Sequence, residues 1–184
     1  MDEWKIDKKI ILKHKLLRTY GYDVYLFYVE AGNEVSLAKE INSRYDTILA
    51  LPICKTAHKS TNGIKTHENT VIIPSVVFVY VMDGESVYNL VLDKYPFKIT
   101  ELLTKNGKLY GPKLDIANII FKYNGLIGLS KAKMVDGLIE IIEGPLYKIQ
   151  DKIIKYDRRN RGCRVRYTVD NKEYCFWLAF EYVS

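Results

Sequence analysis

Residues 144–167 read GPLYKIQDKIIKYDRRNRGCRVRY, and this stretch predicts the fold of the C-terminal part of the chain. It opens on a Gly-Pro turn, continues with a short apolar strand at 153–154 and reaches a polar turn at 157–162. Beyond the turn, apolar or aromatic residues alternate strictly with polar ones. The first set is Cys163, Val165, Tyr167 and Val169, and the second is Arg164, Arg166 and Thr168. A period of two residues is typical of a strand that is buried on one face. The stretch therefore predicts a half-buried β-hairpin.

The same stretch carries the excess positive charge of the protein. Residues 147–167 contain eight Lys or Arg and two Asp, a net charge of +6 that equals the net charge of the whole 184-residue chain. The basic residues are Lys148, Lys152, Lys155, Arg158, Arg159, Arg161, Arg164 and Arg166. Guanidinium groups on a rigid hairpin can bind phosphate through paired hydrogen bonds at little cost in entropy. A solvated edge strand that charge protects from aggregation explains the same composition, so both interpretations stay open at this point.

Three segments of the C-terminal part resemble the KOW motif of NusG-type transcription factors. The segment DGLIEIIEGPL at 136–146 resembles the opening of the motif, and KIIKYDRR at 152–159 is similar to its second strand and basic turn. The segment WLAFEYV at 177–183 resembles the last strand of the family and its closing Leu-x-x-Glu-x-Val signature. The GPL opening and the Asp-Arg-Arg turn are most similar to LoaP, a specialised group of antitermination paralogues. Lys148 and Asp151 depart from the family, which usually has glycines there.

The pattern of residues 21–122 predicts an α+β domain. The apolar runs at 24–29, 48–53 and 76–82 predict strands, and Asn62-Gly63 predicts a hairpin turn. Helices are expected after Asn33, after Gly84 and at 113–123, with an extended piece from Pro96 between the last two. The side chains expected to face inward are Val35, Leu37, Ala38 and Ile41, then Val87, Leu90 and Val91, then Leu114, Ala117, Ile120 and Phe121.

This β-α-β-β-α-β order suits one sheet with flanking helices, and it is similar to the NGN domain of the NusG family. The segment YLFYVEAGNE at 25–34 resembles the first strand of that domain and its turn into a helix, and Leu51-Pro52 resembles a Val-Pro pair. The segment PSVVFV at 74–79 resembles its Pro-Gly-Tyr-hydrophobic-Phe-Val, with Ser75 and Val76 in place of Gly and Tyr. The resemblance implies an NGN domain with an antiparallel sheet at 21–122, a linker at 123–132 and a KOW SH3-like β-barrel at 133–184.

The same resemblance implies a partner for the first domain. In this family, an apolar surface of the NGN domain packs on the clamp helices of the largest RNA polymerase subunit. Val76 and Phe78 stand at the matching positions and are the polymerase-binding candidates. Read simply as residues of a strand, both belong to the core instead. The second partner that we expect is a nucleic acid, in particular a structured nascent RNA, and a monomer is the simpler expectation for the protein.

Other features of the sequence concern the location of the protein, its N-terminal segment and its cysteines. No apolar run approaches the roughly 18 residues of a membrane span, and no signal-peptide pattern is present, so we expect a cytoplasmic protein. Residues 1–20 favour a weakly ordered extension over a short amphipathic helix, because Ile11 and Leu12 interrupt the apolar stripe. The odd number of cysteines, three, argues against a disulfide framework, and we expect these thiols to be buried or half-buried in strands.

Catalysis and metal binding have little support in the sequence. The phosphate-binding, nucleophile-elbow and zinc-protease motifs are all missing from it. The run at 125–128 has the form Gly-x-x-Gly, but its apolar middle favours a linker or the start of a strand over an RNA clamp. Cys54, His58 and His67 are a weak zinc signal, since a fourth ligand is lacking. We therefore expect no enzymatic activity and no cofactor.

Three functions stay open. The first is a specialised antitermination factor that binds RNA polymerase and captures RNA with its KOW domain. The second is the housekeeping elongation factor of the family, whose KOW domain binds termination factor Rho or a ribosomal protein. The third is a structural RNA-binding protein of ribosomal type. The arginine-dense turn and the departures at Lys148, Asp151 and Val76 favour the first function.

Overall fold

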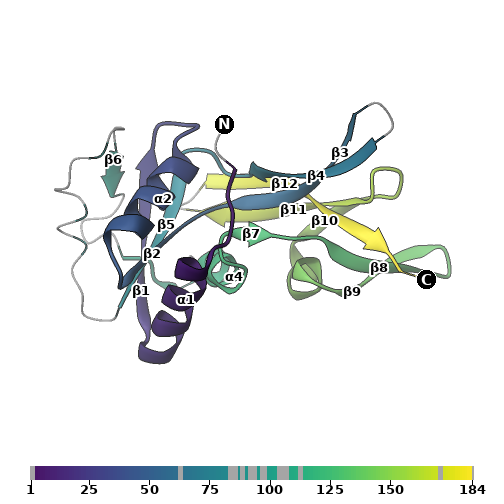
Figure 1. Ribbon diagram of the computed structural model, residues 1–184. Coiled ribbons are helices and arrows are strands. Elements are labelled where there is room, and N and C mark those ends of the chain that lie inside the picture. The colour runs from purple at the N-terminus through teal and green to yellow at the C-terminus, as the bar shows by residue number, and fades with distance from the viewer. Residues whose placement is uncertain are drawn as a thin grey trace. The chain divides into compact units, whose positions relative to one another are not determined.

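The computed structural model describes residues 3–61, 64–82, 87, 90, 95, 99–102, 108–111, 114–169 and 172–183 (Figure 1). By its spatial contacts the chain forms two compact units, one from residues 1–53 and 73–126 and the other from residues 54–72 and 127–184. Helices and mostly antiparallel strands occur together, so the predicted α+β class is confirmed. The segment 54–72, which the sequence placed inside the first domain, belongs to the second unit.

The first unit is built on a four-stranded antiparallel sheet in the order β2-β5-β1-β6. Its strands are β1 (Tyr22–Val29), β2 (Ile48–Pro52), β5 (Val76–Met82) and β6 (Ile99–Leu102). Strand β5 pairs with β2 on one side and with β1 on the other, and its residues 76–81 are all buried. A continuous apolar run is typical of such a central strand. The strands predicted at 24–29, 48–53 and 76–82 are confirmed.

Three described helices belong to this unit: α1 (Lys8–Tyr20), α2 (Glu34–Arg44) and α4 (Leu114–Lys122). Helix α2 buries the four residues predicted for it, Val35, Leu37, Ala38 and Ile41. Helix α4 buries Ile116, Ala117, Ile120 and Phe121, whereas Leu114 is only half-buried. The prediction for Leu114 was wrong because this residue opens the helix, at the end of the apolar stripe that the other four form.

The N-terminal segment is ordered, so the prediction of a weakly ordered extension was wrong. Helix α1 starts at a cap, where the Asp7 side chain accepts a hydrogen bond of 2.9 Å from the Ile10 backbone N. Trp4 is only 1% exposed, and its Nε1 donates to the Asn124 carbonyl at 2.9 Å. A buried Trp removes on the order of 150–250 Å² from water, which orders the chain that leads into the helix. Helices α1 and α4 lie side by side (Figure 1), with the His14 and Phe121 rings 4.2 Å apart.

Lys13 is a buried lysine that joins α1 to the end of α2. Its Nζ donates to the Asn42 carbonyl at 2.6 Å and also to the Tyr45 carbonyl, where the last turn of α2 leaves oxygen atoms without helical partners. Burial lowers the pKa of Lys13 to about 8. Asn42 extends the connection, since its side chain bonds both backbone groups of Ala50 in β2 at 2.7 and 2.9 Å.

The second unit contains the described strands of the C-terminal part and the hairpin 54–72. A five-stranded sheet has the order β10-β11-β12-β8-β9, in which the pair β8–β12 is parallel and the other pairs are antiparallel. Its strands are β8 (Ser130–Val135), β9 (Leu138–Glu143), β10 (Ile153–Asp157), β11 (Gly162–Val169) and β12 (Lys172–Tyr182). A second sheet has the order β4-β3-β7, from β3 (Cys54–Thr61), β4 (Ile64–Val71) and β7 (Leu126–Ile127). The Gly-x-x-Gly run thus contains a short strand, which is one of the two alternatives that its sequence favoured.

A glycine fixes the turn that leads from β9 into the 3₁₀ helix η2 (Pro145–Lys152). Gly144 has φ of +94° and ψ of −167°, a conformation that is essentially restricted to glycine. A Cβ at this position would lie 2.8 Å from the Ser130 Cα. The buried Ser130 Oγ accepts from the Leu146 backbone N at 2.9 Å, which holds the start of η2 against β8. The Gly-Pro pair therefore sets a close approach between two backbone segments.

Some predicted features lie outside the described residues. They are the Asn62-Gly63 turn, the start at Pro96 and most of the helix after Gly84, including Val91. Pairing of Thr61 with Ile64 confirms the hairpin that the turn was expected to close. From the expected helix, Leu90 is buried as predicted, whereas Val87 is only half-buried.

Replacing Lys13 by Met should remove a pH dependence of stability. The unfolded lysine has an ordinary pKa of 10.5 and the folded one a pKa of about 8, so between these values the unfolded chain binds more protons and stability rises with pH. From pH 7.5 to 9.5 the free energy of unfolding of the wild type should therefore gain up to about 2 kcal/mol relative to Lys13→Met. Urea unfolding at fixed pH values measures this gap.

Lys15→Met, at an exposed position of the same helix, serves as the control and should follow the wild type. Burial raises the pKa of the Cys163 thiol to about 12 and acts against stability at high pH, but this effect is common to all three proteins. Parallel pH curves for the wild type and Lys13→Met would show that Lys13 does not titrate as described.

Gly144→Ala should lower the free energy of unfolding by about 3 kcal/mol or more, because the new Cβ meets both an unfavourable φ and the Ser130 backbone. Gly137→Ala is the matched control: its φ is +77° but no heavy atom lies within 4 Å of the added Cβ, so it should cost about 1 kcal/mol. Chemical unfolding of both variants measures the difference. Equal losses would mean that the approach to Ser130 contributes nothing.

Candidate nucleic-acid interface

The solvent face of strands β10, β11 and β12 presents a row of cations that ends on an aromatic ring. The strand register aligns Lys155 with Arg164 and Arg164 with Trp177, and all three side chains are exposed. Directly opposed residues of antiparallel strands lie on the same face, with Cβ atoms about 5 Å apart. We call Lys155, Arg164 and Trp177 the cation–aromatic row. Arg166 continues the basic face along β11, opposite Cys175.

The opposite face of the same strands forms the core of the unit. Cys163, Val165 and Tyr167 are buried, as the alternation of the sequence predicted, and they pair with Leu178, Phe176 and Tyr174 of β12. The Tyr167 and Phe176 rings stack with an interplanar angle of 7°. Burial of this face orients the arginines of β11 toward water. Cys175 is exposed, so the expectation that all three cysteines are buried or half-buried was wrong for this one.

The turn between β10 and β11 is closed by Asp157. Its carboxylate accepts hydrogen bonds from the Asn160 backbone N at 2.9 Å and from Asn160 Nδ2 at 2.8 Å, and these bonds lower the pKa of the Asp157 carboxyl. Arg161 has a positive φ of 50°, and its guanidinium lies 5.9 Å from the centre of the Tyr182 ring. The Arg161 carbonyl accepts from the Phe180 backbone N at 2.9 Å. The turn is therefore held by local bonds and by β12.

The predicted basic residues are not equivalent in the structure. Arg158 donates to the Gly137 carbonyl in the β8–β9 turn, and Arg166 lies 3.4 Å from Glu173. Lys148 and Lys152 belong to η2, where Lys148 lies near the Tyr147 ring and Lys152 forms an ion pair with Asp151 at 2.9 Å. Of the eight, three have no ion pair, side-chain hydrogen bond or ring contact among the described residues: Lys155, Arg159 and Arg164. These three are the most available for a phosphate.

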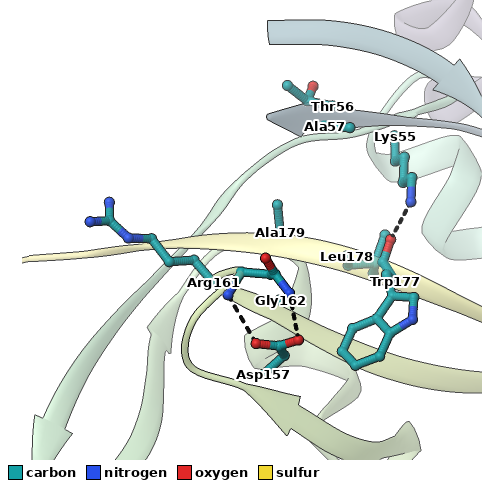
Figure 2. A pocket seen from close by; sticks show the side chains of 10 residues that line it. Lys55, Thr56, Ala57, Asp157, Arg161, Gly162, Trp177, Leu178 and Ala179 are labelled. Atoms are coloured by element: carbon teal, nitrogen blue, oxygen red, sulfur yellow. Dashed lines mark hydrogen bonds between the residues drawn. The ribbon is translucent and has the colours of Figure 1, made fainter. Parts of the chain in front are cut away.

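A hollow lies beside the cation–aromatic row. It has a volume of about 340 Å³ and is lined by Lys55, Thr56 and Ala57 of β3, by turn residues Asp157, Asn160, Arg161 and Gly162, and by Trp177, Leu178 and Ala179 of β12. Figure 2 shows the Trp177 indole below β12 and the Lys55 Nζ above it, where Lys55 donates to the Trp177 carbonyl at 2.8 Å. Burial lowers the pKa of Lys55. This hollow is formed entirely by residues of the second unit.

Sequence reasoning assigned no role in RNA binding to Trp177. The alternation along β12 places it on the solvent side, because Phe176 and Leu178 are buried, and it is 37% exposed. The sequence carried this signal as the pattern FWL, in which an aromatic residue alternates with core residues. Its position beside Arg164 depends on the register between β11 and β12, which the sequence alone does not specify.

The second unit also exposes apolar side chains at one hairpin end. Val135 and Leu138 face each other across the Asp136-Gly137 turn, Met134 precedes them, and Leu138 is 70% exposed. We call Met134, Val135 and Leu138 the apolar tip. Exposed apolar side chains are typical of a surface that binds a protein, so the second unit presents such a surface as well as the basic face.

The polymerase-binding candidates Val76 and Phe78 lie in the core of the first unit. They are 1% and 0% exposed. The reason is the central position of β5, whose residues pair on both sides and are covered on both faces. A polymerase contact through these two side chains stays a prediction, and in this structure neither offers area to a partner.

Among the described residues, no group of three or more His, Cys, Asp or Glu is arranged to hold a metal ion. Cys54 is buried, and the side chain of His58 lies outside the described part. The described helices include none that is both long and apolar enough to span a membrane.

Of the comparisons with known proteins, the search of solved structures found similar chains. A scan against models of protein families found no match, and a search of curated protein sequences found none either. Among solved structures, the chain is similar to NusG of Thermotoga maritima, described for its domain interaction. The two are 16% identical, the alignment covers 86% of this chain and 93% of the other, and the TM-score is 0.46. At this level the similarity by itself assigns no function.

Proposed function

We propose that the protein is a NusG-like transcription factor specialised for antitermination, of the kind found in the LoaP group. In this proposal the first unit binds the clamp helices of RNA polymerase, and the second unit binds a structured nascent RNA through its basic face. The observation that carries the RNA part is the cation–aromatic row of Lys155, Arg164 and Trp177. The polymerase part is supported by the resemblance of residues 25–34, 51–52 and 74–79 to the NGN domain.

The position of the arginines favours nucleic-acid binding over protection of a sheet edge. Charges on an edge strand prevent pairing with other chains, and this reason applies to Lys155 because β10 is the end of the five-stranded sheet. Strand β11 is an interior strand, so its edges are already paired and Arg164 and Arg166 protect nothing. An interior strand with outward arginines beside an indole instead suits a ligand that has both phosphate and flat rings.

A second candidate function is supported by the apolar tip. Met134, Val135 and Leu138 suit a protein partner, as expected for a housekeeping elongation factor whose KOW domain binds Rho or a ribosomal protein. Arg158 lies next to this tip through its bond to the Gly137 carbonyl. The two candidates thus use neighbouring parts of the unit and can be separated by substitution.

The RNA part is tested by reversing two of the arginines that have no ion-pair partner. Arg159→Glu combined with Arg164→Glu should weaken binding of leader transcripts encoded beside the gene by at least about tenfold at 0.15 M salt. The slope of log affinity against log salt should fall by about 2, because each lost phosphate contact removes about one unit. Fluorescence anisotropy with the full chain measures both quantities.

Lys8→Glu combined with Lys15→Glu is the matched control, since it makes the same change in net charge at exposed positions of α1. It should reduce affinity only slightly. If both double variants lose affinity equally, binding follows net charge alone and the assigned face is wrong. Equal and weak binding of every RNA by the wild type would favour the housekeeping function.

The polymerase part is tested by single-round transcription with bacterial RNA polymerase. A template with the preferred leader RNA upstream of an intrinsic terminator should give about twofold or greater read-through when the protein is present. Arg159→Glu with Arg164→Glu should abolish the increase, whereas Leu138→Ser at the apolar tip should leave it unchanged. The opposite pattern would indicate that a protein contact, and not RNA capture, recruits the factor.

A further inference from the structure

The hollow beside Trp177 owes its shape to small residues on three strands. Gly162 and Ala179 are register partners on β11 and β12, and Ala57 of β3 also lines the space. A Cβ on Gly162 would lie 3.3 Å from Trp177 Cε3, so the glycine keeps the surface next to the indole open. The volume of about 340 Å³ is at the lower end of the roughly 300–1,000 Å³ of small-molecule sites. A space of this size suits one flat ring system better than a helical stem.

The charges in and around the hollow favour different parts of a nucleotide inside and outside it. Asp157, Lys55 and Arg161 are the charged residues that line the hollow. The Lys55 Nζ is bound to the Trp177 carbonyl, so the negative charge of Asp157 still disfavours a phosphate there. Its carboxylate already accepts two bonds from Asn160 but has further lone pairs for an N–H group. Arg164 and Lys155 lie outside the hollow on the row that continues from Trp177, and Figure 2 shows the Arg161 side chain directed away from it. Phosphate therefore fits outside and a base inside.

We propose that this hollow takes a single unpaired RNA base. The base stacks on the Trp177 indole, its N–H groups face the Asp157 carboxylate, and the flanking phosphates contact Arg164 and Lys155. This inference rests on the proposed RNA-binding function and narrows it. The preferred ligand is a stem with a bulged or looped-out nucleotide, and a continuous duplex lacks the group that enters the hollow.

The chain contains two tryptophans, which makes stacking directly measurable. Trp4 is buried in the first unit, so Trp4→Phe leaves Trp177 as the single reporter in the full chain. Three RNA hairpins with one stem sequence serve as probes: one with a bulged adenosine, one with an abasic residue at the bulge and one fully paired. The bulged RNA should quench Trp177 emission and should bind about tenfold more tightly than the abasic and paired RNAs.

Two substitutions test the hollow in different ways. Trp177→Leu removes the stacking surface, and Ala179→Leu fills the hollow while keeping Trp177 and every charge. Both should reduce affinity for the bulged RNA to the level of the abasic RNA. Ala179→Leu, which keeps the cation–aromatic row, should leave binding of the paired RNA unchanged. Tyr147→Leu, at an exposed aromatic residue on η2, is the control and should keep the tenfold preference.

The outcomes separate this inference from the proposed function. Equal affinity of Trp4→Phe for bulged and abasic RNA, with a normal salt dependence, would overturn the base site and leave RNA binding by the basic face in place. An unchanged preference in Ala179→Leu, whose circular dichroism matches the wild type, would also overturn the site. Failure of all three RNAs to bind would overturn both proposals.

Discussion

The pairing of β11 with β12 is the constraint on which the second unit depends. It runs from Gly162 opposite Ala179 to Val169 opposite Lys172, and it is extended at the turn by the bond from the Phe180 N to the Arg161 carbonyl. A slip of one residue would exchange the two faces of β11 and bury its arginines. Core packing of Cys163 and Val165 against Leu178 and Phe176 prevents this slip. The same packing therefore determines that Arg164 lies beside Trp177, so the proposed RNA surface depends on the hydrophobic core.

Sequence patterns predicted those parts of the fold that depend on short-range order. The strands at 24–29, 48–53 and 76–82, helix α2 and the alternation on β11 all follow from periodicity over fewer than a dozen residues. The N-terminal segment was misjudged because its order depends on Trp4, whose partner Asn124 lies 120 positions away. The hairpin turn at 62–63 indicated that β3 and β4 pair, but which unit they join is decided by distant strands.

The sequence predicted where the arginines of the candidate site lie, but it did not predict which groups they contact. Charge and alternation located the arginines, because these are local properties of residues 144–167. The availability of each arginine was not predictable, since Gly137, the partner of Arg158, and Glu173, the partner of Arg166, lie outside residues 144–167. Trp177 was overlooked for the same reason, because its neighbours are defined by register. For Val76 and Phe78, the plain strand interpretation describes their burial, and the family resemblance alone suggested a surface role.

The assignment of 54–72 to the second unit has a consequence for synthesis. The chain passes between the units at 53/54, 72/73 and 126/127, so β3 leaves the ribosome roughly 110 residues before β12, whose Trp177 carbonyl accepts the Lys55 bond. At 5–20 residues per second this interval is on the order of ten seconds. Until β7 and β12 have been made, the hairpin has a free strand edge that can pair with other chains. Its sequence, CKTAHKSTNGIKTHENTV, is mostly polar. That composition, which resembles a loop, suits a strand pair that must stay unaggregated until its partner is translated.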